Sequence, residues 1–293
     1  MIRSMTGFGD AQLVADTQAY HVEIRSVNNR YFKASIHLPD EFGFLEPDVE
    51  RLVRERITRG SVTLRVHRRD LSPNAAQDIN AAALRRYVEQ MQAVRRDDAG
   101  LVIDLAKIAL LPGVCQPREV TEAERETYWG VVSKLVDGAV ERMLVMRATE
   151  GKSLADDLMR HVTRIRDHLA RVRERAPLVV VEYRDRLKTR VEELLSRSNV
   201  QLAEQDLLKE VSIYAERSDI SEEISRLAAH LDQVEDCLSS REPAGRKLDF
   251  LSQELLREAN TMGAKASDAQ IAKDIIEIKS AIDRVKEQVQ NVE

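Results

Sequence analysis

The sequence predicts an α+β protein that is mostly helical. A small N-terminal α/β unit with an antiparallel sheet should be followed by long helices and by a C-terminal helical domain that contains an antiparallel helix pair. Charged residues make up 32% of the 293 residues and aromatic residues only 4%, a composition typical of long, charge-covered helices. Apolar and polar residues alternate in parts of the first 70 residues, as in half-buried strands. Beyond them the apolar residues recur mostly with the period of a helix.

The first 70 residues contain four segments that predict strands, the first of them an opening strand at residues 1–9, and one that predicts a helix. Residues 20–26 and 61–69 alternate between apolar and polar side chains, and residues 31–38 continue as a strand after a turn-like Asn-Asn pair. Residues 44–59 have helical apolar spacing, and Gly60 stands where a helix C-cap belongs. Together these segments predict a small α/β unit with a mainly antiparallel sheet.

One face of the predicted sheet should be basic. A basic face with aromatic side chains nearby, here Tyr31 and Phe32, can bind RNA through phosphate contacts and base stacking. An ordinary solvated sheet face explains the same pattern, so both interpretations stay open. The candidate RNA-binding residues are Arg25, Asn28, Arg30, Lys33, Arg65 and His67.

The middle of the chain predicts further helices. They should span about 78–97, 101–110 and 121–148, with the Leu-Pro-Gly break at 111–113 before the third. The Glu-Gly-Lys-Ser sequence that follows is not a phosphate-binding loop, because Met146 stands where that motif needs glycine.

Residues 152–216 predict long helices that are interrupted near Ala176-Pro177. Long helices with a small core often pair with other chains, so we expect subunit contacts here. We expect three parts of the chain: 1–155, 156–207 as connecting helices, and 208–293 as the C-terminal helical domain.

The stretch from Asp219 to Lys265 predicts two helices joined by a break at SSREPAG. Each helix has an apolar stripe with polar, chemically active side chains on its flank. If the helices pack together, these carboxylates and an imidazole could hold a divalent metal ion. A solvated face with ion pairs one turn apart explains the same spacing. The flanking residues are Asp219, Glu223, Arg226 and His230 on the first helix, and Glu254 and Glu258 on the second.

The last helix has an apolar residue at every third or fourth position from Ile271 to Val292. Such a regular stripe needs a partner helix, and the stripe at 220–238 is the simplest choice.

Composition and charge limit the function. The net charge is −5, and residues 191–293 contain 13 basic against 22 acidic residues, which excludes a generally basic nucleic-acid binder and suits cation binding. Cys115 and Cys237 are isolated, which predicts a reduced, cytoplasmic chain. No N-terminal signal-like segment and no run of about 18 apolar residues is present, so we expect no membrane partner.

Several segments at both ends of the chain match the motifs of a known family. These segments are MIRSMTGFG at residues 1–9, residues 23–39, residues 45–62, residues 216–231, residues 245–268 and residues 287–293. With them the sequence resembles the YicC/YloC family of bacterial endoribonucleases. Between residues 71 and 205 the resemblance is limited to TEGKSL at 149–154.

This resemblance implies a cytoplasmic endoribonuclease that cleaves single-stranded or structured RNA internally in bacterial RNA turnover. It also implies a divalent metal ion, Mn²⁺ or Mg²⁺, and a homo-oligomer, a hexamer, with RNA rather than DNA as its partner. The metal cluster thereby becomes the favoured interpretation, with a non-catalytic oligomeric RNA-binding scaffold or adaptor as the alternative. The expected metal ligands are Glu223, His230, Glu254, Glu258 and Asp219, and the expected catalytic residues are His230, Glu223, Glu258, Arg226 and Arg257.

Overall fold

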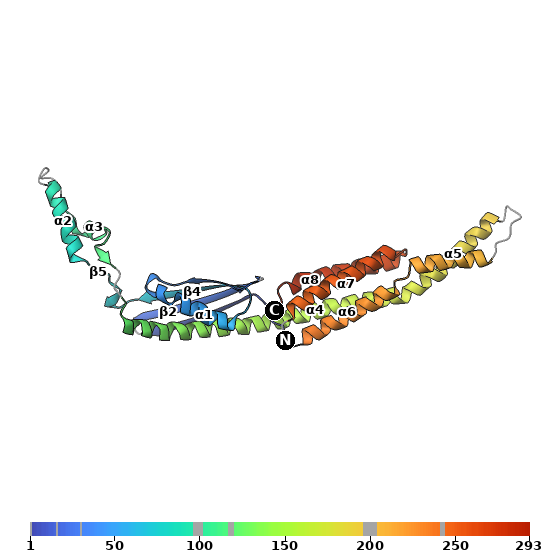
Figure 1. Cartoon of the computed structure of the whole chain (residues 1–293), viewed down its shortest axis with the longest axis horizontal. Coiled ribbons are helices and arrows are strands. Elements are labelled where there is room, and N and C mark those ends of the chain that lie inside the picture. Colours follow the sequence, from blue (N-terminus) through green and yellow to red (C-terminus); the bar gives the residue numbers. More distant parts are fainter. Residues whose placement is uncertain are drawn as a thin grey trace. The chain divides into compact units, whose positions relative to one another are not determined.

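The computed structural model describes residues 2–15, 17–29, 31–95, 102–116, 120–195, 204–240 and 244–293. It confirms the predicted class, an α+β protein that is mostly helical (Figure 1). The chain forms two compact units. One is Phe8–Met143, and the other combines Met1–Gly7 with Leu144–Glu293.

The first unit is built on a four-stranded sheet with the order β1-β2-β4-β3. Its strands are β1 (Gly7–Ala15), β2 (Gln18–Val27), β3 (Lys33–His37) and β4 (Ser61–Asp70). β2 and β4 are antiparallel, as expected, whereas β3 runs parallel to β4. The parallel pair arises because η1 and α1 connect β3 to β4 as a crossover, which a parallel connection requires.

The alternation of side chains gives this sheet one covered and one open face. Tyr20, Val22 and Ile24 on β2 are buried, as are Leu64 and Val66, the β4 partners of Ile24 and Val22. The covering elements include η1 (Asp40–Leu45) and α1 (Glu46–Arg56), which contribute buried apolar side chains. The basic face predicted from the sequence is therefore the opposite, open one.

The end of α1 differs from the prediction. The helix ends at Arg56, because Ile57 is buried and adopts an extended conformation. Gly60 is not the helix cap. With a φ of 108° it makes the turn into β4, and a Cβ there would approach the carbonyl oxygen of Val27 to 3.2 Å.

The outer part of the first unit is a short hairpin-like pair of strands with two helices. It contains η2 (Pro73–Ala75), β5 (Asp78–Ile79), α2 (Ala81–Arg95), α3 (Leu105–Ala109) and β6 (Cys115–Gln116). The helix expected from residue 78 begins at 81, because β5 pairs with β6 and the Asn80 side chain caps α2.

The longest element is α4 (Glu122–Leu195), a single helix of 74 residues. The predicted end near residue 148 and the predicted break near Pro177 are both wrong. Proline removes one helical hydrogen bond and crowds the preceding turn. However, Val172 before it and Val179 after it are buried in the same core, which holds the helix together.

The glycine of the Glu-Gly-Lys-Ser sequence lies inside α4, as expected for a stretch that is not a phosphate loop. A Cβ at Gly151 would lie 2.4 Å from the carbonyl oxygen of Ile2. The glycine therefore allows the N-terminal segment to pack directly on the helix backbone.

The second unit is a helical bundle. α5 (Glu204–Arg217) is followed by α6 (Ser221–Ser239), α7 (Gly245–Lys265) and α8 (Ala269–Val289). Their apolar stripes join residues of α4 in one buried core, and Figure 1 shows these helices running alongside α4.

The partner of the last helix differs from the expectation. α6 packs on α7, and α7 packs on α8. α4 forms ion pairs with α6 through Arg166 and Asp232 and with α8 through Arg164 and Glu277. The stripe of α8 is therefore covered by α7 and α4 rather than mainly by α6, since α8 follows α7 after a short connection.

The two ends of the chain meet in this unit. Arg3 exchanges two backbone hydrogen bonds with Glu293, and Met5 donates one to Asn291. Arg147 of α4 is buried between them, where its guanidinium donates to the Ser4 carbonyl oxygen and to the Glu293 carboxylate. The N-terminal and C-terminal motifs are therefore joined to each other by backbone hydrogen bonds.

Among the described helices, none combines the length and the apolar content that a membrane-spanning segment needs.

Candidate metal centre and RNA-binding face

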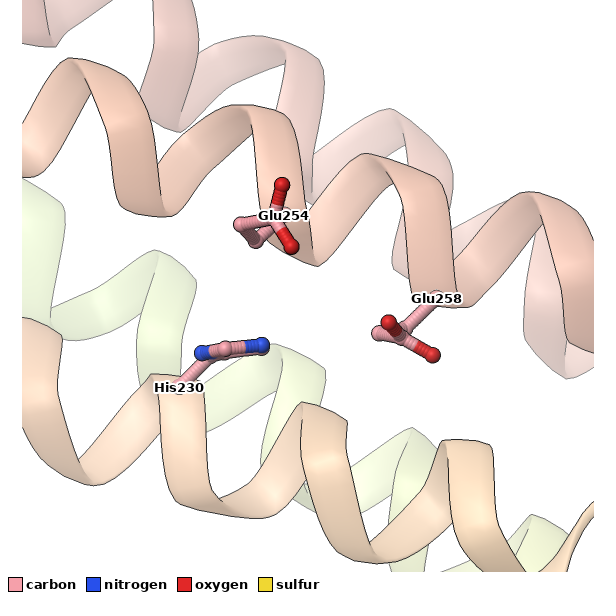
Figure 2. Close-up of side chains that lie close together, drawn as sticks. All are labelled: His230, Glu254 and Glu258. Atoms are coloured by element: carbon pink, nitrogen blue, oxygen red, sulfur yellow. The ribbon is translucent and has the colours of Figure 1, made fainter.

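Three of the predicted metal ligands meet between α6 and α7. His230 lies on α6, and Glu254 and Glu258 lie one turn apart on α7. Each offers a ligand atom, and these atoms all lie within 4.8 Å of one another. Figure 2 shows the imidazole and the two carboxylates pointing into the space between the two helices. The apolar stripes bring them together, because the stripes set the register in which the helices pack.

Two members of the cluster, Glu258 and His230, have polar groups that no described residue pairs with. Glu258 is 3% exposed, and no described residue forms an ion pair with it. Nδ1 of His230 is buried and has no hydrogen-bond partner among the described residues. Buried charges are normally paired or coordinate a metal. One imidazole nitrogen and two carboxylates are a donor set that suits a transition-metal dication such as Mn²⁺, so the residues present fit a metal ion.

Glu254 is the more accessible carboxylate of the cluster. It accepts a hydrogen bond from Arg257 at 3.1 Å, one turn further along α7. Arg226 on α6 is bonded to Glu222 of its own helix. Both guanidinium groups are exposed and can change partner at small cost, since exposed ion pairs contribute little stability.

Glu223 and Asp219 lie outside this cluster. Glu223 precedes His230 by two helical turns and is 6% exposed, and its Oε1 accepts a hydrogen bond from Lys265 at 2.7 Å. This hydrogen bond raises the pKa of the Lys265 amine above its usual value. Asp219 accepts hydrogen bonds from the hydroxyl and the backbone amide of Ser221, which lower the pKa of the Asp219 carboxyl.

Lys265 is the residue that the sequence reasoning missed. It stands seven residues after Glu258, just as Glu223 stands seven residues before His230. In antiparallel helices these two offsets bring the lysine opposite Glu223. The sequence did contain a signal for this pair, because Lys265 has the same seven-residue spacing from Glu258 that Glu223 has from His230.

The candidate RNA-binding residues lie on the open face of the sheet or at its edge. Arg25, Lys33, Arg65 and His67 are all exposed on it, and Asn28 is exposed just after β2. Arg30 lies outside the described residues. The register separates them into two groups, with Lys33 and Arg25 beside Ser61 and Thr63, and Arg65 and His67 further along β4.

Aromatic side chains accompany the first group. The Arg25 guanidinium lies 5.4 Å from the ring centre of Phe8 on β1. Phe32 lies 5.3 Å from the guanidinium of Arg54, which belongs to α1 and therefore to the elements on the covered face. The Tyr31 residue is 69% exposed. Cationic and aromatic groups therefore occur together here, as binding of single-stranded RNA requires.

Comparisons with known proteins agree over the whole chain. Residues 2–156 match the family model "Endoribonuclease YicC-like, N-terminal region", and residues 172–293 match "Endoribonuclease YicC-like, C-terminal". The chain is 33% identical over 303 residues to "Probable endoribonuclease YicC" of Clostridioides difficile. It is 30% identical over 295 residues to the protein of the same name from Haemophilus influenzae. Both alignments cover 100% of this chain and 100% of the relative.

Proposed function

Because the chain belongs to the YicC-like endoribonuclease family and is thus a ribonuclease, we propose that its cleavage of RNA depends on a divalent metal ion held by His230, Glu254 and Glu258. The observation that carries this proposal is the buried Glu258 carboxylate, which has no cation beside it among the described residues. The imidazole among the ligands favours Mn²⁺ over Mg²⁺, which prefers oxygen ligands.

The residues around the cluster have separate tasks in this proposal. A bound dication lowers the pKa of a coordinated water and neutralises phosphate oxygens. His230 and Glu258 are fixed in place by the helix packing and orient the ion. Arg257 is exposed beside Glu254 and donates to a phosphate oxygen of the substrate, since arginine matches the geometry of phosphate. Arg226, which is also exposed, is a second candidate for this role.

Glu223 supports the centre without being one of its three ligands. Its hydrogen bond to Lys265 ties α6 to α7 two turns away from His230. The pair therefore helps to fix the register on which the distances between His230, Glu254 and Glu258 depend. Asp219 accepts hydrogen bonds from Ser221 and so stabilises the start of α6.

The RNA is held by the open face of the sheet in the first unit. Arg25, Lys33, Arg65 and His67 contribute phosphate contacts there, with Asn28 at the edge. These contacts carry no sequence information, so we expect binding to depend strongly on salt and weakly on RNA sequence.

Metal removal tests the proposal. Purified protein treated with EDTA and freed of the chelator should not cut a labelled structured RNA, and Mn²⁺ should restore cleavage. Undiminished cleavage after removal of the metal would contradict the proposal. RNA binding that persists without any cleavage in Mn²⁺ or Mg²⁺ would favour the scaffold or adaptor function.

A further inference from the structure

Three of the six histidines of the chain lie on the open face of one sheet. His21 is on β2, His37 on β3 and His67 on β4. His21 and His67 are direct cross-strand neighbours, with ring centres 6.4 Å apart. His37 is the register partner of Arg65, two residues before His67 on β4. The sheet thus gathers three imidazoles at one end, away from Arg25 and Lys33.

This end of the sheet has a hollow on each side of His67. One hollow has a volume of about 170 Å³ and is lined by residues that include His21, His67 and Arg69. The other has a volume of about 400 Å³ and is lined by residues that include His37, Arg65 and His67. Both hollows are open and lie beside β4. An extended ligand could therefore cross β4 and contact both hollows.

The two arginines at this end of the sheet, Arg65 and Arg69, have no counterion within the described part of the chain. Among the residues that the structure describes, none forms an ion pair with Arg65 or Arg69, and both are exposed. By contrast, Arg51 and Arg54 on α1 are paired with acids of their own helix. Unpaired arginines on a sheet face are available for phosphate groups.

Among the described residues, two acids form close contacts with these imidazoles, and both are beside His21. Asp10 Oδ2 lies 3.9 Å from His21 Nε2, and Glu23 Oε1 lies 3.7 Å from His21 Nδ1. Glu23 also lies 3.8 Å from Arg25. On β3, the hydroxyl of Ser35 is the polar group next to His37. The neighbouring Arg68 belongs to the covered face, where Glu41 and Asp70 bind it.

We propose that His21, His37 and His67, with Arg65 and Arg69, form a phosphate-binding site for single-stranded RNA that strengthens when the histidines gain protons. The RNA as ligand rests on the proposed function. Histidine is the residue type that changes its charge between about pH 5 and 8. Three protonated imidazoles therefore add three positive charges beside Arg65 and Arg69, where the nearby carboxylates are those of Asp10 and Glu23. Each cation that contacts a phosphate releases a condensed counterion and increases affinity.

RNA fits this surface better than an acidic peptide. Phosphates repeat along an extended backbone, which matches cations spread along one strand and its neighbours. Imidazole rings also offer flat surfaces on which unpaired bases stack. Neither hollow encloses its contents, as a site for one small phosphate compound would.

Binding of a fluorescent oligouridylate to the full-length protein in EDTA tests the site, because uridine gains no proton in the relevant range. The affinity should be about tenfold higher at pH 5.5 than at pH 8.0. The slope of log K against log salt should steepen by about 2, since each contact with a single strand adds about 0.7. The triple variant His21→Gln, His37→Gln, His67→Gln should lose both changes.

A second triple variant fixes the charge instead of removing it. With His21→Arg, His37→Arg and His67→Arg, binding should be tight at both pH values. The control His161→Gln, in the other unit, should keep the pH dependence of the natural protein. Circular dichroism of each variant confirms that it is folded.

The inference is overturned if the natural protein binds equally at both pH values or if the triple glutamine variant keeps the pH dependence. Equal binding of oligoglutamate at pH 5.5 would overturn the choice of RNA as ligand. Cleavage in Mn²⁺ at pH 8.0 is measured in parallel. Its presence without pH-dependent binding contradicts this site alone, and its absence beside pH-dependent binding contradicts the proposed metal-dependent cleavage alone.

Discussion

Glu223 and Glu258 are both buried carboxylates on facing helices, but only Glu223 has a cation beside it. This difference favours Glu258 over Glu223 as a ligand in the proposed site, whereas Glu223 keeps one buried oxygen, Oε2, without a hydrogen-bond partner among the described residues. Sequence spacing places both on the flanks of apolar stripes and cannot distinguish them. The distinction depends on which residue of α7 lies opposite each acid of α6, and the register of the helix pair decides that.

The Glu223–Lys265 pair should contribute to stability. Lys265→Met leaves a buried carboxylate unpaired and should lower the free energy of unfolding by about 1–3 kcal/mol. The expected loss is below that of a fully buried pair, because the Lys265 side chain is 37% exposed. The pKa of Lys265 is raised, so the contribution is complete at pH 7 and is lost only as the pH rises through that raised pKa.

Urea unfolding at pH 7 measures this loss, and the added Glu223→Gln change should recover part of it. The matched control is Arg226→Gln, which breaks an exposed pair with Glu222 and should change the free energy of unfolding by less than about 1 kcal/mol. Equal small effects of Lys265→Met and Arg226→Gln would contradict the structural role of the pair.

At the scale of elements, local sequence patterns predicted which residues form the central strands, but they did not predict how the strands pair. Alternation in β2 and β4 predicted two central strands correctly, since one buried and one open face impose a period of two. The parallel pairing of β3 with β4 has no local signal. The continuity of α4 was missed for a related reason. The rule that proline ends helices is local, whereas burial of Val172 and Val179 in one core is a tertiary effect.

The continuity of α4 predicts the effect of a single substitution. Pro177 is exposed, so Pro177→Ala opens no cavity and restores a helical hydrogen bond. The change should raise the free energy of unfolding by up to about 3 kcal/mol. Pro177→Gly should gain about 1 kcal/mol less, because glycine is a poorer helix former. Thermal and urea unfolding measure both, and destabilisation by Pro177→Ala would show that the helix is broken there.

At the scale of the whole molecule, the motifs at the two ends of the chain predicted the family correctly. The structure explains part of this, because Arg3–Met5 and Asn291–Glu293 pair with each other around Arg147. The division into 1–155, 156–207 and 208–293 stays a prediction. Assembly into a homo-oligomer also stays one, since contacts between chains depend on surfaces that periodicity within one chain does not specify.

Assembly should involve the long helices, as the sequence predicted for residues 152–216. Several apolar side chains of α4 and α5 are exposed there, among them Leu178, Val181, Leu194 and Leu208. Light scattering should give a multiple of the 33.3 kDa chain mass, and Leu194→Glu with Leu208→Glu should lower it. A mass of one chain at micromolar concentrations would contradict this prediction.

The most direct test of the metal centre is single-turnover RNA cleavage by Glu258→Gln, together with its melting temperature with and without Mn²⁺. The substitution keeps the shape of the side chain and removes the buried charge. We expect loss of cleavage, RNA binding within a few-fold of the natural protein, and an unchanged or higher melting temperature without metal. We also expect Mn²⁺ to stabilise the natural protein and not the variant. Cleavage at the natural rate, with equal stabilisation of both proteins by Mn²⁺, would contradict the proposed metal centre.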